Sequence, residues 1–223
     1  MSISSLVLRL RVPRRWWNCK EYIVYFQPLV SPPPGAGVQD GPVRFRLAAP
    51  HDIPRMSRYL GTWASWCRGG TPVDDPAEVL AEQFVGQDIT VIGTADRPAG
   101  ELVYLAWYSH DDFGLTLLGD AARRGREVTI RRAWVPPDRR RSGVALSGWR
   151  FAQAELIRRG VQGIWSFVRI ENTASQGLHR KLGIEQRGRA RILTRLGRRY
   201  GAIRLDPDDR WRTMRIPQAV THL

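Results

Sequence analysis

The segment Val135–Ala145 carries the residues of this chain best suited to bind a pyrophosphate group. Arg140 and Arg141 supply fixed positive charge, and Gly143 lets the backbone come close to a ligand. The preceding residues 127–135 have the β-branched and aromatic content of a strand, which a pair of prolines then ends. Apolar residues follow at three- and four-residue spacing, as on one face of a helix. Because unpaired amides at a helix N-terminus attract anions, this pattern predicts a phosphate-binding turn.

Two short patterns in the chain resemble motifs of the GNAT superfamily of N-acetyltransferases. The first, Arg140-x-x-Gly143-x-Ala145, resembles motif A, whose pattern is Arg or Gln, two residues, Gly, one residue, and Gly or Ala. The second, at residues 171–184, resembles motif B. It has the asparagine and the Leu-Gly ending of that motif, with His179 where members often carry a tyrosine. The predicted order of strands and helices around both motifs also agrees with the superfamily.

The resemblance covers roughly residues 43–205 and implies an α/β (α+β) fold. The expected architecture is a mixed, mostly antiparallel central sheet of about six to seven strands, flanked by about four helices. The sheet should be splayed between its two central parallel strands. Residues 1–30 are expected to form an N-terminal extension with an extra strand, and residues 31–42 a linker rich in proline and glycine. Residues 206–223 are expected to be a C-terminal tail.

Composition and periodicity predict the individual elements. Asp52 is expected to cap a helix that carries Met56 on its apolar side, and a second helix is expected at about 75–86. Residues 97–100 are expected to form a hairpin turn, and residues 185–205 a closing hairpin. Strands are expected at residues 21–28, 43–47, 89–93, 101–108, 127–135 and 163–170.

The resemblance also implies a cosubstrate, acetyl-CoA or another acyl-CoA. Its pyrophosphate would bind the amides of residues 141–145, and its pantetheine arm would run along the strand that ends at Val135. A neutral amine would attack the thioester carbonyl while a backbone N–H near Val135 stabilises the oxyanion. The implied cofactor-binding residues are Ala133, Val135, Arg140, Arg141, Ser142, Gly143, Val144, Ala145, Asn172 and Ser175.

Two side chains are candidates for catalysis, His179 and Glu127. His179 occupies the position at which many superfamily members use a tyrosine to protonate the leaving sulfur, and histidine can donate a proton near neutral pH. The alternative for His179 is a polar residue on a short helix. Glu127 lies on the central strand, where members often use a glutamate as general base. The alternative for Glu127 is an exposed residue at the start of that strand.

The remaining reactive side chains do not predict metal or redox chemistry. His110, Asp111 and Asp112 could bind the acceptor amine, although a plain hairpin loop is the simpler interpretation. One histidine beside two adjacent aspartates lacks a further spaced ligand, so no metal site is predicted. Cys19 and Cys67 make no disulfide framework, which favours a cytoplasmic protein. No apolar run reaches membrane-spanning length, so no membrane association is expected.

The net charge of +14 comes almost wholly from arginine, because lysine occurs only at positions 20 and 181. A GC-rich genome would explain the arginine excess. An anionic partner, either the phosphates of the cofactor or a nucleic acid, is the functional alternative. Arg187, Arg189 and Arg191 alternate along one predicted strand and would share a single face. That face is either solvated or a binding surface.

Three functions remain open from the sequence. The Arg140-x-x-Gly143 loop favours an enzyme, an acyl-CoA-dependent N-acyltransferase that acts on a small amine or amino-acid-like metabolite. The positive charge favours an RNA-associated enzyme of the same fold, which acylates aminoacyl-tRNA or uses it as the aminoacyl donor. The missing tyrosine favours a noncatalytic binding domain. A monomer and a homodimer are both compatible with the sequence.

Overall fold

The computed structural model describes residues 18–32, 41–64, 89–95, 100–110, 113–119, 122, 126–195, 198–207 and 210–216. Cys67, Asp111, Asp112 and the helix expected at 75–86 lie outside the described residues. So do most of the expected linker and all but the last residue of the expected turn at 97–100.

Within the described residues, nine strands form one sheet in the order β2-β3-β4-β5-β6-β1-β7-β8-β9. The strands are β1 (Asn18–Pro28), β2 (Val43–Leu47), β3 (Ile89–Ala95), β4 (Leu102–Ser109), β5 (Glu127–Trp134), β6 (Gly163–Arg169), β7 (Glu185–Arg195), β8 (Arg198–Leu205) and β9 (Arg212–Ile216). The helices are α2 (Ile53–Ala64), α4 (Phe113–Leu118), α5 (Val144–Arg158) and α6 (Thr173–Lys181), with 3-10 turns η2 (Pro50–Asp52) and η4 (Pro137–Arg139).

The mixed, mostly antiparallel sheet expected from the sequence is confirmed. Strands β5 and β6 pair in parallel, and every other neighbouring pair described is antiparallel. The sheet has nine described strands in place of the expected six or seven, because β1 and β9 lie outside residues 43–205. The closing hairpin expected at 185–205 is formed by β7 and β8. Part of the expected C-terminal tail is therefore strand β9, which extends the sheet beyond β8.

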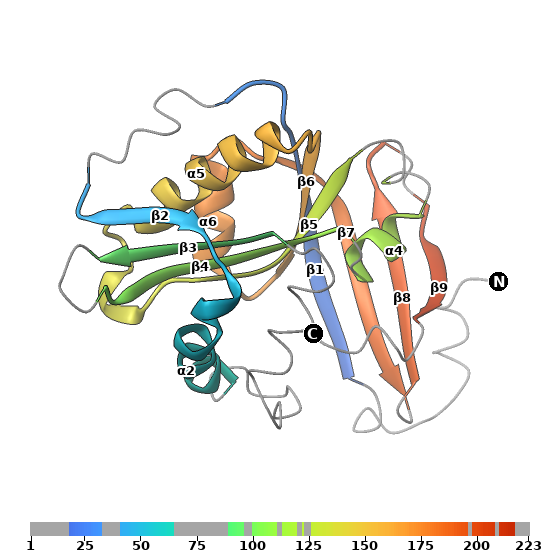
Figure 1. Ribbon diagram of the computed structural model, residues 1–223. Coiled ribbons are helices and arrows are strands. Elements are labelled where there is room, and N and C mark those ends of the chain that lie inside the picture. The colour runs from blue at the N-terminus through green and yellow to red at the C-terminus, as the bar shows by residue number, and fades with distance from the viewer. Residues whose placement is uncertain are drawn as a thin grey trace.

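Strand β1 lies inside the sheet, between β6 and β7, although it comes first in the chain (Figure 1). It pairs with β6 over Tyr22–Pro28 and with β7 over Asn18–Phe26. Its residues alternate between the two faces of the sheet, and Val24 and Tyr25 are both buried. The extra strand expected in residues 1–30 is thus a structural part of the core.

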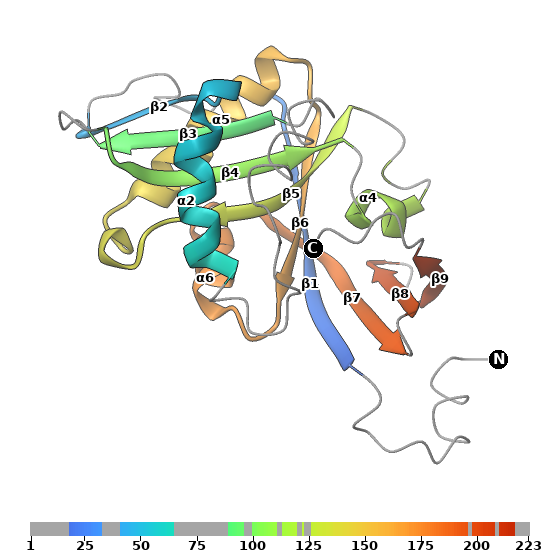
Figure 2. The same ribbon diagram turned by 60° about the horizontal axis from the view of Figure 1, so that its bottom comes forward.

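Helices cover both faces of the sheet (Figures 1 and 2). On one face, Met56 of α2 packs with Leu105 and Trp107 of β4. Helix α4 lies on the same face, where its leucines pack with residues of β1, β6, β7 and β8. On the other face, α5 packs closely on β4, because an ideal Cβ at Gly148 would lie 2.6 Å from the ring of Tyr104. Helix α6 follows on this second face.

The two parallel strands separate partway along their length, which confirms the expected splay. Their register pairs Glu127 with Gly163 and ends where Ile130 pairs with Ser166. Both strands continue beyond this point, β5 to Trp134 and β6 to Arg169. The register of β5 with β4 also shifts here. A gap in strand pairing therefore opens toward the C-terminal ends of β5 and β6.

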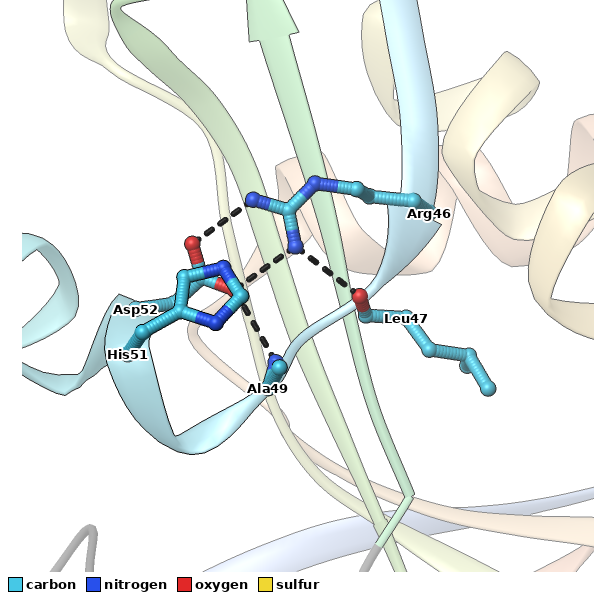
Figure 3. A network of polar contacts seen from close by, with 5 residues as sticks. All are labelled: Arg46, Leu47, Ala49, His51 and Asp52. Carbon is cyan, nitrogen blue, oxygen red and sulfur yellow. Dashed lines mark hydrogen bonds and ion pairs between the residues drawn. The ribbon is translucent and has the colours of Figure 1, made fainter.

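Asp52 does not take the capping role expected for α2. Its carboxylate accepts hydrogen bonds from the two terminal guanidinium nitrogens of Arg46, at 2.6 and 2.7 Å, and from the amide of Ala49 at 2.9 Å (Figure 3). These bonds close turn η2 and tie it to the end of β2. Burial alone would raise the pKa of Asp52, but the bonds from Arg46 and Ala49 outweigh it and hold that pKa below its usual value.

Candidate active site

The connection from β5 to α5 adopts an unusual backbone conformation. Turn η4 begins at the second of the two prolines, and Arg141 and Gly143 after it both have left-handed backbones, with φ of 67° and 86°. A left-handed arginine is uncommon and marks a strained position of the kind found at binding sites. The Ser142 hydroxyl donates to the carbonyl of Arg139 at 2.6 Å and fixes the turn.

The first amides of α5 lie ahead of its helical hydrogen bonds. The Ser147 amide donates to the carbonyl of Gly143 at 3.0 Å, so the amides of residues 143–146 precede the helical bonding pattern. Gly143 is the N-cap, and no side chain in the described ranges caps this end. A Cβ placed on Gly143 would meet no atom within 4 Å, so space is open beside it. These features suit a pyrophosphate group, since helix N-termini bind anions.

The end of β5 offers backbone groups for an extended ligand. Beyond Ile130 this strand has no register with β6, so one side of it faces the splay. Ala133 is exposed although β5 lies in the middle of the strand order, and Val135 is partly buried. An extended chain could bind backbone groups on this side of β5 as an added strand. Ala133 and Val135 are followed by turn η4 and then by the left-handed residues before α5.

Helix α6 begins at the same edge of the sheet, because the C-terminal ends of parallel strands lie side by side. Asn172 caps this helix, its side-chain oxygen accepting a hydrogen bond from the amide of Ser175 at 3.1 Å. The Asn172 side chain therefore serves as the N-cap of α6. The carbonyl of Ser175 in turn bonds to Nδ1 of His179 at 2.8 Å.

His179 is buried between aromatic rings instead of lying on an exposed helix face. Only 3% of it is exposed. Its ring centroid lies 4.5 Å from that of Tyr25 on β1 and 5.6 Å from that of Trp149 on α5. Trp149 is held by its own hydrogen bond to the side chain of Gln27 at 2.8 Å. The imidazole is thus fixed where α5, α6 and β1 meet.

The contacts of His179 determine which of its nitrogens carries the proton. A carbonyl oxygen can only accept, so the bond to Ser175 places the hydrogen on Nδ1. Burial lowers the pKa of His179, against a smaller opposing effect of the Ser175 carbonyl, which favours the neutral ring. Nε2 then has a lone pair, and it is buried without a partner in the described part of the chain. In this state His179 accepts a proton, whereas an acid role requires a second proton that burial disfavours.

Glu127 lies away from the other candidates, at the N-terminal end of β5. Its carboxylate accepts a hydrogen bond from the indole of Trp165 at 2.7 Å. Burial raises the pKa of Glu127, and this hydrogen bond opposes the shift in part. The residue is three positions, or about 10 Å, from Ile130, where the splay begins. The structure therefore does not bring Glu127 together with residues 133–145.

Two buried hydroxyls at the start of the splay were missed from the sequence. Thr129 and Ser166 are each 2% exposed, and neither hydroxyl has a partner within the described residues. Ser166 lies between Ile130 on β5 and Tyr25 on β1 in the strand register. Threonine and serine in a β-rich stretch give no separate signal, so only the register reveals their position.

Three further predictions from the sequence concern a metal site, the acceptor cluster at His110 and membrane-spanning helices. Among the described residues, no three histidine, cysteine, aspartate or glutamate side chains gather as a metal site would require. His110 follows β4, but the two aspartates beside it are not described, so the proposed acceptor cluster stays a prediction. None of the described helices has the length and apolar character needed to cross a membrane.

Comparison with known proteins agrees with this geometry. Residues 59–184, more than half of the chain, match the Acetyltransferase (GNAT) family. None of the curated proteins compared with the chain matches it significantly. Strand β1 lies outside the matched residues, although it completes the same sheet.

Solved structures share the fold at low sequence identity. A GCN5-related N-acetyltransferase from Sphaerobacter thermophilus is similar with a TM-score of 0.59 and 18% identity, over 86% of this chain and 55% of that one. A GCN5-related N-acetyltransferase from Kribbella flavida has a TM-score of 0.52 and 11% identity, over 86% and 62%. This chain thus spans little more than half the length of both. AAC(6')-Iy, solved with the bisubstrate analogue CoA-S-monomethyl-acetylneamine, has a TM-score of 0.50 and 23% identity, over 65% and 91%.

The family match, the splayed parallel strands and the order of elements agree. The chain belongs to the GNAT acetyltransferase family.

Proposed function

We propose that the protein is an acyl-CoA-dependent N-acyltransferase that transfers an acyl group, most simply acetyl, to the primary amine of a small metabolite or amino-acid-like acceptor. One observation carries the proposal. The splay opens toward the end of β5, and a short connection through turn η4 and two left-handed residues leads from there to the start of α5, which no described side chain caps. An extended thioester arm and a pyrophosphate need these two features in this order.

The proposed contacts follow from the positions of the residues. The amides of residues 141–145 hold the pyrophosphate, with the charges of Arg140 and Arg141 close by. Backbone groups at Ala133 and Val135 hold the arm. Asn172 and Ser175 border the arm from α6, although the Asn172 oxygen already caps that helix.

The transfer itself needs few side chains. A neutral amine attacks the thioester carbonyl, a backbone N–H near Val135 stabilises the oxyanion, and the thiolate leaves. His179 accepts or donates a proton during the transfer. Its bond to Ser175 supports a role as proton acceptor more than the acid role expected from the family position. Glu127, bonded to Trp165 and distant from the splay, is the weaker candidate for a general base.

Calorimetric titration with acetyl-CoA tests the proposal, followed by a panel of amines with detection of released thiol. We expect saturable binding at one site and thiol release that depends on an amine. Failure to bind acetyl-CoA, CoA or a longer acyl-CoA by folded protein would contradict it.

A second candidate is supported by the charge of the chain. In this alternative the enzyme acylates aminoacyl-tRNA or uses it as the aminoacyl donor, and the arginines exposed on β7 are the supporting observation. Titration with bulk tRNA and assay of aminoacyl-tRNA as acceptor separate the two candidates. Acyl transfer to free amines at a rate equal to or above that with aminoacyl-tRNA would leave the small-amine proposal in place.

A further inference from the structure

The β7–β8 end of the sheet has one apolar face and one basic face. Ala190 and Ile192 of β7 are buried in the cluster that α4 covers. Arg189 and Arg191 alternate with them and are exposed on the opposite face. Across the strand pair, Arg189 lies directly opposite Arg204 of β8.

Arg191 and Arg204 both stack on the ring of Trp211. The guanidinium carbon of Arg191 lies 4.8 Å from the centroid of the Trp211 ring, and that of Arg204 lies 5.4 Å from it. Arg191 also bonds to the carboxylate of Glu21 on β1 at 2.8 Å. We call Arg189, Arg191, Arg204 and Trp211 the arginine face.

Arg187 does not belong to this face, which corrects the expectation that residues 187, 189 and 191 share one side. The pairing of β1 with β7 shifts register between Val24 and Tyr25, next to Arg187. Arg187 instead lies over the ring of Phe26 at 5.9 Å and bonds to Glu185 at 2.9 Å. A bulge of this kind reverses the side on which a residue emerges, and sequence alternation alone could not reveal it.

The arrangement suits an anionic ligand with several phosphates. Like charges placed opposite one another on a sheet repel, so an anion between Arg189 and Arg204 would relieve that repulsion. Stacking on Trp211 engages the flat faces of two guanidinium groups and holds them in position. Such pre-positioned guanidinium groups lose less conformational entropy when they bind phosphate.

We propose that the arginine face binds the phosphodiester backbone of a nucleic acid. The net charge of +14 would draw a polyanion to the protein, and the arginine face supplies the direct contacts. Contacts to phosphate carry no sequence information, so binding through them is independent of sequence. Strands β6 and β1 separate β7 from β5, a lateral distance of roughly 14 Å. The proposal therefore stands or falls separately from the acyl-CoA site.

A matched pair of double variants tests the proposal. Arg189→Gln/Arg191→Gln removes two charges from the arginine face and frees Glu21. Arg158→Gln/Arg159→Gln removes two charges from the end of α5 and frees Glu155, which both arginines bond. Binding of tRNA and of a duplex DNA with a similar number of phosphates is measured at several salt concentrations. Thermal unfolding and acetyl-CoA binding verify that each variant is folded.

For the wild-type protein we expect binding that weakens with salt. The arginine-face variant should reduce the slope of log K against log salt by about 2 and weaken binding roughly tenfold or more near 0.1 M salt. The α5 variant should change the slope by less than about 0.5. A further variant, Trp211→Leu, keeps every charge and should weaken binding several-fold with little change in slope. Tighter binding of tRNA than of DNA would identify RNA as the partner, and equal binding would support the phosphodiester contact alone.

Three results would overturn the proposal. Folded wild-type protein could fail to bind either nucleic acid at low salt. The two double variants could lose affinity for nucleic acid equally, which would show that binding depends on the net charge of the protein and not on the arginine face. A polyglutamate of matched charge could bind as tightly as tRNA, which would show that phosphate is not recognised.

Discussion

The starts of α5 and α6 differ, although both helices follow the C-terminal ends of the two parallel strands. Helix α6 caps itself through Asn172, which takes up the amide of Ser175. Helix α5 begins at the left-handed Gly143 with no side-chain cap. A glycine N-cap is only a few tenths of a kcal/mol less favourable than asparagine, so α5 lacks the side-chain cap of α6 at little cost in stability. We expect α5 to keep its first amides for a ligand, whereas α6 uses its first turn to orient His179.

Replacement of His179, which the first turn of α6 orients, should give the greatest loss of activity. We expect His179→Ala to lower kcat by about 100-fold, the lower end of what a general acid or base contributes, with less than threefold change in the Kd of acetyl-CoA. The pH profile of the wild type decides the direction of proton transfer. Because the pKa of His179 is lowered, a proton acceptor keeps kcat high at neutral pH and loses it as pH falls below 6.5. A kcat that instead falls as pH rises through this region would restore the acid role.

Changing Gly143 tests the claim that the uncapped start of α5 binds the ligand. A β-branched side chain at φ of 86° is strained and would occupy the open space before the amides. We expect Gly143→Val to weaken acetyl-CoA binding by about 30-fold or more, equivalent to losing one or two hydrogen bonds to a charged group. Gly183→Val is the control, because Gly183 has a similar φ of 65° and equally open space at the far end of α6. Equal loss of affinity in the two variants would remove the distinction between the helix starts.

A smaller effect is expected at Arg141, the left-handed residue before the helix. Arg141→Gly relieves the backbone strain and removes one charge near the proposed pyrophosphate. We expect thermal stability to be unchanged or slightly higher and acetyl-CoA affinity to fall about fivefold at low salt. The loss should shrink as salt rises. A stable protein with unchanged affinity at low salt would show that this side chain does not serve the site.

The smallest expected effect on the ligand concerns Asn172. Asn172→Ala should lower the free energy of unfolding by about 1 kcal/mol because it removes the cap of α6. Acetyl-CoA affinity should change by less than about threefold, since the side-chain oxygen serves the helix. Denaturant unfolding and calorimetry measure the two quantities on one sample. A large loss of affinity with unchanged stability would give Asn172 the ligand role and remove the contrast with Gly143.

Local signals made part of this structure predictable. The proline pair, Gly143 and the apolar spacing after it each act over a few residues, and the strand, turn and helix formed as expected. The parallel splay followed from the family resemblance. The role of Asp52 was not predictable, because its carboxylate bonds to the Ala49 amide within η2 and to Arg46 of β2 in place of capping α2.

Features that depend on pairing between strands far apart in the sequence could not be predicted from the sequence. A strand was expected within residues 1–30, but alternation does not specify which strands become its neighbours, so the insertion of β1 between β6 and β7 was not foreseen. The same holds for the hydroxyls of Thr129 and Ser166, which are brought to the splay by register. For His179, the motif gave the position, whereas its burial by Tyr25 and Trp149 depends on β1 and α5.

The central claim is that the start of α5 binds the pyrophosphate of an acyl-CoA. It is tested most directly by calorimetric titration of the wild type and of Gly143→Val with CoA and with pantetheine, which lacks the pyrophosphate. We expect the wild type to bind CoA at least about 100-fold more tightly than pantetheine, and the variant to lose most of that difference. Equal affinities of the wild type for the two ligands, or an undiminished difference in Gly143→Val, would contradict the claim.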